Sequence, residues 1–140
     1  MEFSQTEQKL TLADMDDFER KIGLKLPQDF KEHYLKFNGG YPSFEYVKGL
    51  RNIFTINSFD SIKYGALPIE KLIDDFQESG VDFNNKIPFA NDNGDNIFLI
   101  SLDDSDYGKI YIIEAEFLEN KNYILVSESF TDFLNSFFNE

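Results

Sequence analysis

The stretch IPFANDNGDNIFLI, residues 87–100, carries the strongest indication of the fold in this chain. Two apolar runs rich in Ile, Phe and Leu flank a polar centre that extends from Asn91 to Asn96. Large apolar residues favour strands, whereas Asn, Asp and Gly favour the turns between strands. The stretch therefore predicts two antiparallel core strands, over residues 86–90 and 96–102, joined by a turn.

The strand pattern continues on both sides of this stretch. Strand-forming residues recur over residues 109–113 and 123–126, and the polar segment 103–108 is typical of a hairpin loop. Two shorter candidates lie at residues 44–47 and 53–56. Consecutive strands with short connections predict an antiparallel meander.

Helical spacing of apolar residues surrounds these strands. It predicts helices over residues 11–22, 29–37 and 68–77, with Gly23 ending the first and Pro27 in the first turn of the second. A last helix begins at a cap, Ser127 or Ser129, and its buried side is predicted to hold Phe130, Phe133, Leu134, Phe137 and Phe138. We therefore expect one α+β domain over residues 1–140, an antiparallel β-sheet meander packed with N-terminal helices and a C-terminal helix.

Composition excludes several classes of protein. The chain has no Cys, which rules out disulfides, thiolate metal sites and a Cys nucleophile. It has no apolar run of membrane-spanning length and no signal-peptide pattern, so we expect a soluble cytoplasmic protein. A net charge of −13 argues against nucleic acid or an anionic membrane surface as the partner.

The negative charge is concentrated in the second half of the chain. Residues up to Lys71 hold ten bases and eleven acids, whereas residues from Asp74 onward hold three bases and fifteen acids. Such a surface either keeps the protein soluble or steers a basic partner toward it. Sequence alone leaves both interpretations open.

The polar centre of the opening stretch has three interpretations: a calcium loop, a catalytic acid site and a turn. A helix–loop–helix calcium site needs a Glu at its twelfth position, but twelve residues counted from Asp92 end at Asp103, and the flanks are predicted strands. A turn is favoured, because Asn and Asp side chains bond their own backbone and Gly94 can adopt a positive φ. By the same reasoning Asp103, Asp104 and Asp106 are better explained as a solvated loop than as an acid–base pair.

Other candidates for chemistry are few. His33 is the single His and has no second ligand or nucleophile at a suitable spacing. Gly39 and Gly40 follow a predicted helix, whereas a phosphate loop precedes one. The sequence predicts no catalytic residue, no metal and no cofactor, and it shows no constellation for a further interpretation, an enzyme or a ligand binder. A deep pocket holding carboxylates with perturbed pKa would favour that interpretation.

Four segments, in this order, resemble the SUKH superfamily, the Smi/Knr-type domain. They are DFERKIGLKLP (17–27), QDFKEHYLKFNGG (28–40), IPFANDNGDNIFLISL (87–102), and GKIYII (108–113) followed by VSESFTDFLNSFF (126–138). One departure is the lack of any Trp after the Gly-Lys strand. The positions that carry the resemblance, expected to have structural roles, are Leu26, Pro27, Asn38, Gly39, Gly40, Pro88, Phe89, Gly94, Asp95, Gly108 and Phe130.

This resemblance implies a non-enzymatic α+β domain. Bacterial members are commonly immunity proteins of polymorphic or contact-dependent toxin systems, which bind a cognate toxin, often a nuclease, and block it inside the producing cell. Fungal members are regulators of cell-wall synthesis that act as interaction hubs. The resemblance thus favours an immunity protein and keeps a regulatory or scaffold module with an endogenous partner as the alternative.

Charge and resemblance together suggest where a partner binds. A nuclease holds phosphates on a basic surface, which an inhibitor can cover with carboxylates. The hypothesis is that a basic protein partner contacts acids of the second half, and that the chain is a monomer or a weak homo-oligomer. The candidate partner-binding residues are Asp92, Asp95, Asp103, Asp104, Asp106, Glu114 and Glu116, with a structural role favoured over partner contact for Asp95.

Overall fold

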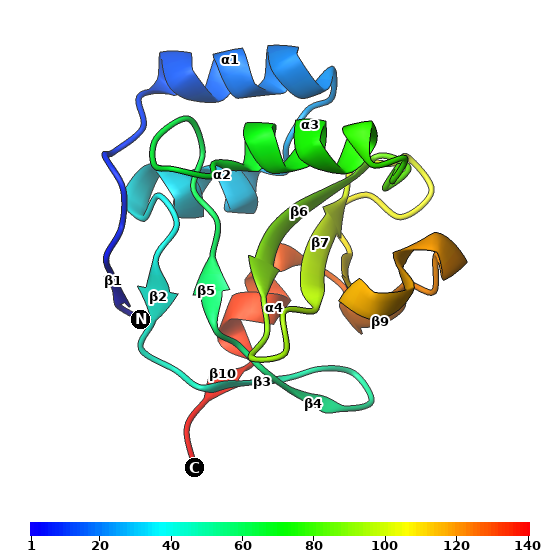
Figure 1. Cartoon of the computed structure of the whole chain (residues 1–140). Helices are drawn as coiled ribbons and strands as arrows, with labels where there is room; N and C mark the ends of the chain where they lie inside the picture. Colours follow the sequence, from blue (N-terminus) through cyan, green and yellow to red (C-terminus); the bar gives the residue numbers. More distant parts are fainter.

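A five-stranded antiparallel sheet forms the centre of the computed structural model, which describes residues 1–140 (Figure 1). Its strand order is β5-β6-β7-β8-β9. The strands are β5 (Ser58–Phe59), β6 (Lys86–Asn91), β7 (Ile97–Ser101), β8 (Ile110–Ile113) and β9 (Ile124–Ser127). The last four follow the chain as a meander, because each is joined to the next by a connection short enough for antiparallel neighbours.

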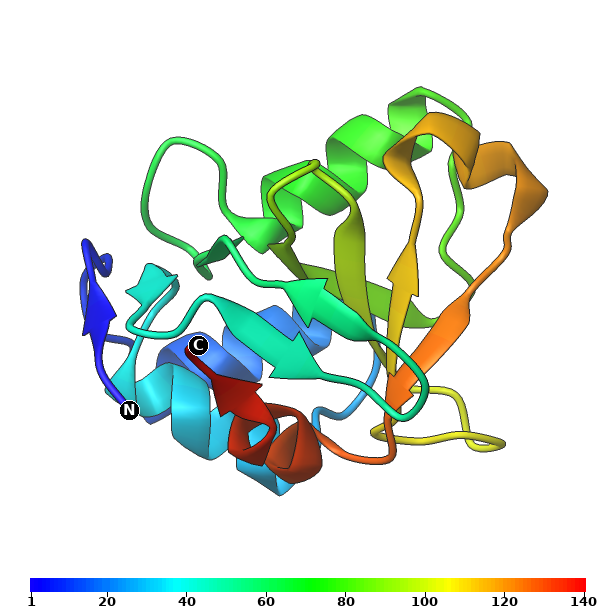
Figure 2. The same ribbon diagram turned by 90° about the horizontal axis from the view of Figure 1, so that it is seen from below.

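Two small sheets complete the strands. β1 (Phe3–Ser4) pairs with β2 (Tyr41–Pro42), and β3 (Tyr46–Lys48) lies between β4 (Ile53–Thr55) and β10 (Phe137–Phe138). Figure 1 shows β3 and β4 below the main sheet, and in Figure 2, seen from below, they lie in front of it with the C-terminal strand β10 beside them. Both ends of the chain are thus tied to segments distant in sequence.

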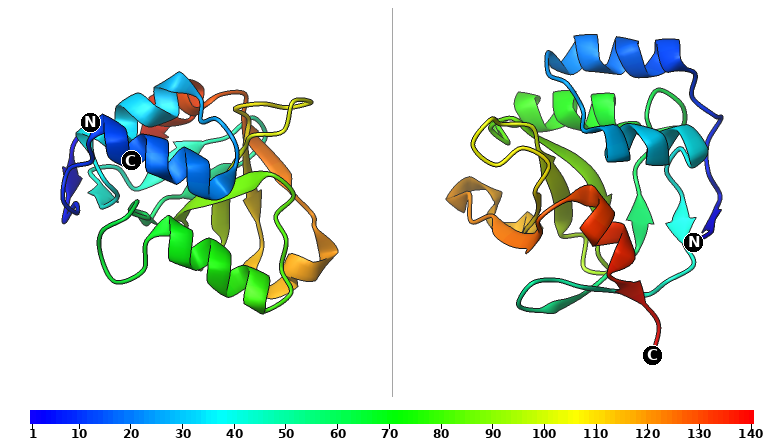
Figure 3. Two further views of the ribbon diagram at one scale, coloured as in Figure 1. Left: turned by 90° about the horizontal axis from the view of Figure 1, so that it is seen from above. Right: turned by 180° about the vertical axis from the view of Figure 1, so that it is seen from behind.

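Helices cover both faces of the main sheet. They are α1 (Leu12–Ile22), α2 (Gln28–Lys36), α3 (Ile69–Glu78) and α4 (Phe130–Asn135), with a 3-10 helix, η1, at Ala115–Asn120. In Figures 2 and 3 the sheet lies between α3 on one side and α2 and α4 on the other. No helix is long and apolar enough to cross a bilayer.

The ends of α1 show how local sequence sets an element. Thr11 and Asp14 form a capping box, in which each side chain accepts a hydrogen bond from the other residue's backbone N–H. At the other end Gly23 adopts a left-handed φ of 75° and its N–H donates to the Glu19 carbonyl. The helix therefore ends where the sequence predicts, with Gly23 as its C-cap.

Two hydrophobic clusters lie on the two faces of the sheet. The larger one joins the sheet to α2 and α4 and is dominated by aromatic rings, among them Phe30, Tyr34, Phe89, Phe98, Phe130 and Phe133, all fully buried. The smaller one is formed by Phe83, Leu99 and Ile113, with Phe76 of α3 packed against it. Burial of these aromatic side chains provides most of the driving force for the fold.

The predicted α+β architecture is confirmed, but three details are wrong. Phe137 and Phe138 belong to strand β10 and not to the last helix, because Ser136 ends α4 and the next residues pair with β3. α1 begins at Leu12 and not at residue 11, because Thr11 is its N-cap, and the Leu12 side chain is 72% exposed. Pro27 is the N-cap of α2 and lies just before its first turn.

Several positions of the family resemblance hold segments together. The Asn38 side chain donates to the carbonyls of Gln8 and Ile62 and accepts from the Ile62 N–H at 2.7 Å. The buried Leu26 N–H donates to the Glu19 carboxylate at 2.8 Å. Gly108 adopts a φ of 87° in the loop between β7 and β8, where the Tyr107 hydroxyl donates to the Lys25 carbonyl. Pro88 is buried in β6, next to Phe89 of the larger cluster.

Candidate functional site

The polar centre of residues 91–96 is a turn held by Asp92. Its Oδ1 accepts the backbone N–H groups of Gly94 and Asn96 at 2.9 and 2.8 Å, and its Oδ2 accepts from the Asn96 amide at 3.0 Å. The carboxylate therefore replaces missing backbone partners at the tip of the β6–β7 hairpin. Asp92 acts as an anchor of the turn.

The backbone of this turn differs from the prediction at one position. Asp95, with a φ of 65°, takes the left-handed conformation, whereas Gly94 has no positive φ. Asp tolerates this region better than most residues, because its short side chain is polar. The Asp95 side chain is exposed and makes no hydrogen bond, so its carboxylate is free.

The loop between β7 and β8 also contains both carboxylates that are hydrogen bonded within the protein and a carboxylate that is free. The Asp106 carboxylate accepts the Ser101 hydroxyl at 2.5 Å and the Tyr111 hydroxyl at 2.6 Å. Partial burial opposes its ionisation, but these two hydrogen bonds keep the pKa of Asp106 below its usual value. Asp103 accepts from the Ser105 hydroxyl at 2.7 Å, and Asp104 is exposed with a free carboxylate.

A stack of Lys and Tyr side chains lies beside Asp106. The Lys86 ammonium lies 4.4 Å from the ring centre of Tyr123 and 5.3 Å from that of Tyr111. Burial, together with the hydrogen bond to Asp106, raises the pKa of Tyr111 to about 12. The cation–π contacts of Lys86 with the two tyrosines stabilise this end of the sheet and hold the Lys86 side chain against the surface of the protein.

The seven candidate carboxylates form two groups at opposite ends of the sheet. The turn carboxylates are Asp92, Asp95, Glu114 and Glu116; they share one end because the Ala115 N–H donates to the Asn96 side chain at 3.1 Å. The hairpin carboxylates are Asp103, Asp104 and Asp106, in the loop drawn yellow in Figure 1, at the other end. The structure therefore does not join all seven into one patch.

The candidate carboxylates form no ion pair within the protein, although the charges of Lys86 and Lys109 favour ionisation of Asp106. None of the seven takes part in the six ion pairs of the structure. Of the three bases after Asp74, Lys86 stacks on tyrosines and Lys109 pairs with Glu128 at 3.2 Å. The second half of the chain consequently presents a largely uncompensated negative surface.

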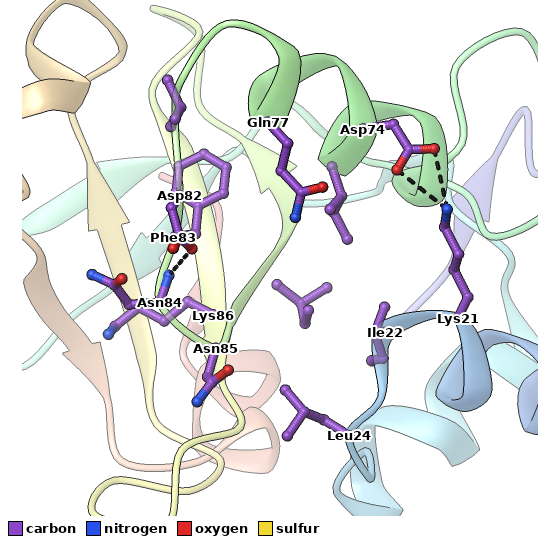
Figure 4. Close-up of a pocket in the computed structure, with 13 residues that line it drawn as sticks. Lys21, Ile22, Leu24, Asp74, Gln77, Asp82, Phe83, Asn84, Asn85 and Lys86 are labelled. Atoms are coloured by element: carbon purple, nitrogen blue, oxygen red, sulfur yellow. Dashed lines mark hydrogen bonds and ion pairs between the residues drawn. The ribbon is translucent and has the colours of Figure 1, made fainter.

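A groove of about 200 Å³ lies between the end of α1, α3 and the start of β6 (Figure 4). Its apolar side chains include Ile22, Leu24 and Phe83. Its charged side chains are engaged locally: the Lys21 ammonium lies 3.2 Å from both carboxylate oxygens of Asp74, and Asp82 accepts the Asn84 N–H at 2.9 Å. The groove assembles no nucleophile with a base, and no group of three or more His, Asp or Glu side chains anywhere is placed to hold a metal ion.

His33 lies in an aromatic box. Its ring centre is 5.0 to 5.7 Å from those of Phe3, Phe37, Phe59 and Phe130, and its Nε2 is buried without a hydrogen-bond partner. Burial lowers the pKa of His33 to about 4, with a smaller contribution from the Lys36 charge. The side chain is packed as a neutral core residue.

Comparison with protein families gives a match to the SMI1 / KNR4 family (SUKH-1) over residues 9–136. The chain belongs to the SUKH-1 family. The match includes all four helices and every strand except β1 and β10. No curated protein matches the chain.

Membership of the SUKH-1 family confirms the resemblance drawn from the four sequence segments. In the structure Gly40, which carries part of that resemblance, lies beside a feature that sequence reasoning missed. Gly40 pairs with Phe59 of β5. Asp60, which follows Phe59, has a partly buried carboxylate without a hydrogen-bond donor. No sequence pattern marks Asp60, because three distant segments create its surroundings.

Proposed function

We propose that this SUKH-1 protein is an immunity protein of a bacterial polymorphic or contact-dependent toxin system. It neutralises a cognate toxin, a nuclease, by direct protein–protein binding. The observation that carries the proposal is the set of free carboxylates on the second half of the chain, in a family whose bacterial members commonly have this role.

The chemistry of the target supports this choice. A nuclease must display Lys and Arg side chains where it holds phosphates. Asp95, Glu114 and Glu116 are exposed, lie in turn or helical segments at one end of the sheet, and have no partner of their own. Carboxylates of this kind can pair with the basic groups of the nuclease and block access of nucleic acid.

The hairpin carboxylates fit this role less well. Asp106 and Asp103 are already hydrogen bonded within the protein, which leaves Asp104 as the one free carboxylate of that group. We therefore place the toxin-facing surface at the turn carboxylates.

Co-expression with the product of the neighbouring gene tests the proposal. Wild-type protein should restore growth of cells that express that product and should co-purify with it. The triple variant Asp95→Lys, Glu114→Lys and Glu116→Lys should lose both properties, because it places like charges against a basic surface.

A matched control separates local charge from total charge. The triple variant Asp16→Lys, Glu45→Lys and Glu78→Lys changes the net charge equally, at exposed side chains without ion pairs. It should still restore growth. If wild-type protein fails to protect and binds a housekeeping protein instead, the alternative of a regulatory or scaffold module replaces the proposal.

A further inference from the structure

A second pocket lies beside β5, whose Ser58 pairs with Asn91 next to the β6–β7 turn. It has a volume of about 260 Å³ and is bounded by the segment after β1, by β2, by β5 and by the loop that leads to α3. The side chains and glycines that define it are Glu7, Gly40, Tyr41, Asp60, Gly65 and Leu67, and we call it the Asp60 pocket. In Figures 1 and 2, β1 and β2 lie on the opposite side of the molecule from the yellow β7–β8 loop.

Asp60 contributes a carboxylate whose interactions are incomplete. Its backbone is fixed on both sides, since its N–H donates to the Phe89 carbonyl at 2.7 Å and its carbonyl accepts the Tyr34 hydroxyl at 2.8 Å. Its carboxylate has no hydrogen-bond donor and no ion pair, although burial raises its pKa to about 6. Its oxygens still reach solvent, since neither is a buried atom without a partner, and a ligand that brings hydrogen-bond donors can bind them.

The groups around the Asp60 carboxylate add negative charge and provide no base to pair with it. Glu7 adds a second negative charge to the pocket. The nearest base in the loop, Lys63, is engaged with Asp14 at 2.7 Å. The Tyr34 hydroxyl donates to the backbone carbonyl of Asp60 and not to the Asp60 carboxylate.

Two of the residues that line the pocket have large apolar side chains that are open to solvent. Tyr41 and Leu67 are 45% and 47% exposed, two of the few large hydrophobic side chains left open to solvent. An aromatic ring and an aliphatic side chain in the same pocket as two carboxylates suit a ligand with an apolar stem and a cationic end.

The same geometry argues for binding and against acid–base catalysis. The Ser58 hydroxyl donates to Asn91 at 3.0 Å and the Ser61 hydroxyl donates to the Tyr64 carbonyl at 2.5 Å, so neither is free to be activated by Asp60. Two carboxylates also provide fewer oxygen ligands than Ca²⁺ takes, which is six to eight. An organic cation fits the pocket better.

The walls of the pocket depend on glycine. A Cβ at Gly40, whose φ is 101°, would lie 2.5 Å from the Ser4 carbonyl oxygen, and one at Gly65 would lie 3.2 Å from a carboxylate oxygen of Glu7. Side chains at either position would displace β1 or Glu7. The Gly-Gly sequence after α2 thus keeps the pocket in shape.

We propose that the Asp60 pocket receives an arginine side chain of the protein partner. The guanidinium pairs with the Asp60 carboxylate and stacks on Tyr41, and the aliphatic stem lies along Leu67. Arginine suits this site better than lysine, because its planar group both stacks on rings and bonds a carboxylate through two N–H groups. The biological role rests on the proposed function, to which the pocket adds a second anchor.

Titration of the whole 15N-labelled protein with N-acetyl-arginine N-methylamide tests the inference by NMR. At pH 7.5 the amide signals of Tyr41, Asp60 and Gly65 should shift saturably, with a Kd on the order of millimolar. The citrulline analogue, which has the same shape without the charge, should cause no such shift. Binding should weaken at least tenfold from pH 7 to pH 5, because Asp60 becomes protonated.

Variants assign the shifts to the pocket. Asp60→Asn should abolish binding while keeping the shape of the side chain, and Tyr41→Ala should weaken it about threefold to tenfold. Asp104→Asn, an exposed residue outside the pocket, should leave it unchanged. The inference is overturned if no saturable shift occurs, if citrulline binds equally, if Asp60→Asn still binds, or if the shifts lie only at residues 92–96 or 103–106. The assay needs no toxin, so a negative result would overturn the pocket inference alone, and the growth-rescue test would still decide the proposed function.

Discussion

Asp60 and His33 impose opposite pH dependences on the stability of the fold. Burial raises the pKa of Asp60 from 3.8 to about 6, so the folded chain binds this proton more tightly than the unfolded chain. The stability contributed by Asp60 therefore falls as pH rises from about 4 to 6. Burial lowers the pKa of His33 from 6.5 to about 4, so the stability contributed by His33 falls as pH decreases over nearly the same range.

The first prediction is that Asp60→Asn stabilises the protein at neutral pH. The substitution removes the cost of a buried carboxylate, which corresponds to up to about 3 kcal/mol for a pKa difference of about two units. The difference from wild type should be near zero at pH 4 and reach its full value above pH 6. Urea denaturation from pH 4 to pH 8 measures it, with Asp104→Asn expected to change stability by a few tenths of a kcal/mol. A less stable Asp60→Asn protein at pH 7 would show that the carboxylate has a partner.

The second prediction concerns His33→Phe. Phenylalanine is close in size to histidine and suits a box of four Phe rings, and it removes the buried Nε2 that lacks a partner. The variant should lose the component of stability that increases between pH 4 and pH 6.5, so its stability should fall with pH over that range as Asp60 ionises. Thermal unfolding at several pH values measures this slope. An unchanged slope would mean that the pKa of His33 is the same in the folded and unfolded chains.

At the scale of elements, the third prediction compares two acids of the β6–β7 turn. Asp92→Ala removes three hydrogen bonds from the hairpin tip and should destabilise the protein by about 1–2 kcal/mol. Asp95→Gly replaces a side chain in the left-handed region and should be neutral or stabilising by up to about 1 kcal/mol. Chemical denaturation of the two single variants provides the measurement, each serving as the control for the other. Equal losses would show that the carboxylate of Asp95 also supports the turn.

Elements with enough residues to show a period are predictable from the sequence. The four meander strands and the helices α1, α2 and α3 appear within a few residues of the ranges expected. The two-residue strands β1, β2, β5 and β10 are too short for a pattern, and they exist because distant backbone groups bind them. Phe137 fits the helical spacing of Phe130 and Phe133, yet pairing with Val47 decides its conformation.

The same distinction applies to the candidate site. Asp92 and Asp106 attract attention because polar residues cluster between strands, but only the structure shows that both carboxylates are engaged internally. Asp60 gives no signal in the sequence, since it follows a short strand and resembles any loop acid. Its environment arises when β1, β2 and the loop before α3 meet.

At the scale of the whole molecule, the placement of charge matters more than its total. The ion pairs involve mainly the first half of the chain, where bases are plentiful. The turn carboxylates and the Asp60 pocket are distinct sites that meet at the pairing of Ser58 with Asn91, so a partner with one basic surface and one protruding arginine can contact both. Electrostatic steering by the turn carboxylates would govern the rate of encounter, whereas a filled pocket would slow dissociation.

The fourth prediction follows from that separation and concerns the complex with the product of the neighbouring gene. Neutralising Asp95, Glu114 and Glu116 to Asn, Gln and Gln should slow association several-fold at low salt and flatten its salt dependence, with little effect on dissociation. Asp60→Asn should leave the association rate almost unchanged and speed dissociation at least tenfold, because a desolvated arginine–carboxylate pair is lost. Stopped-flow and surface-binding kinetics from about 25 mM to about 500 mM salt distinguish the two effects. If neutralising Asp16, Glu45 and Glu78 slows association as much as the triple variant at the turn, net charge alone steers the partner and the turn carboxylates have no special place in recognition.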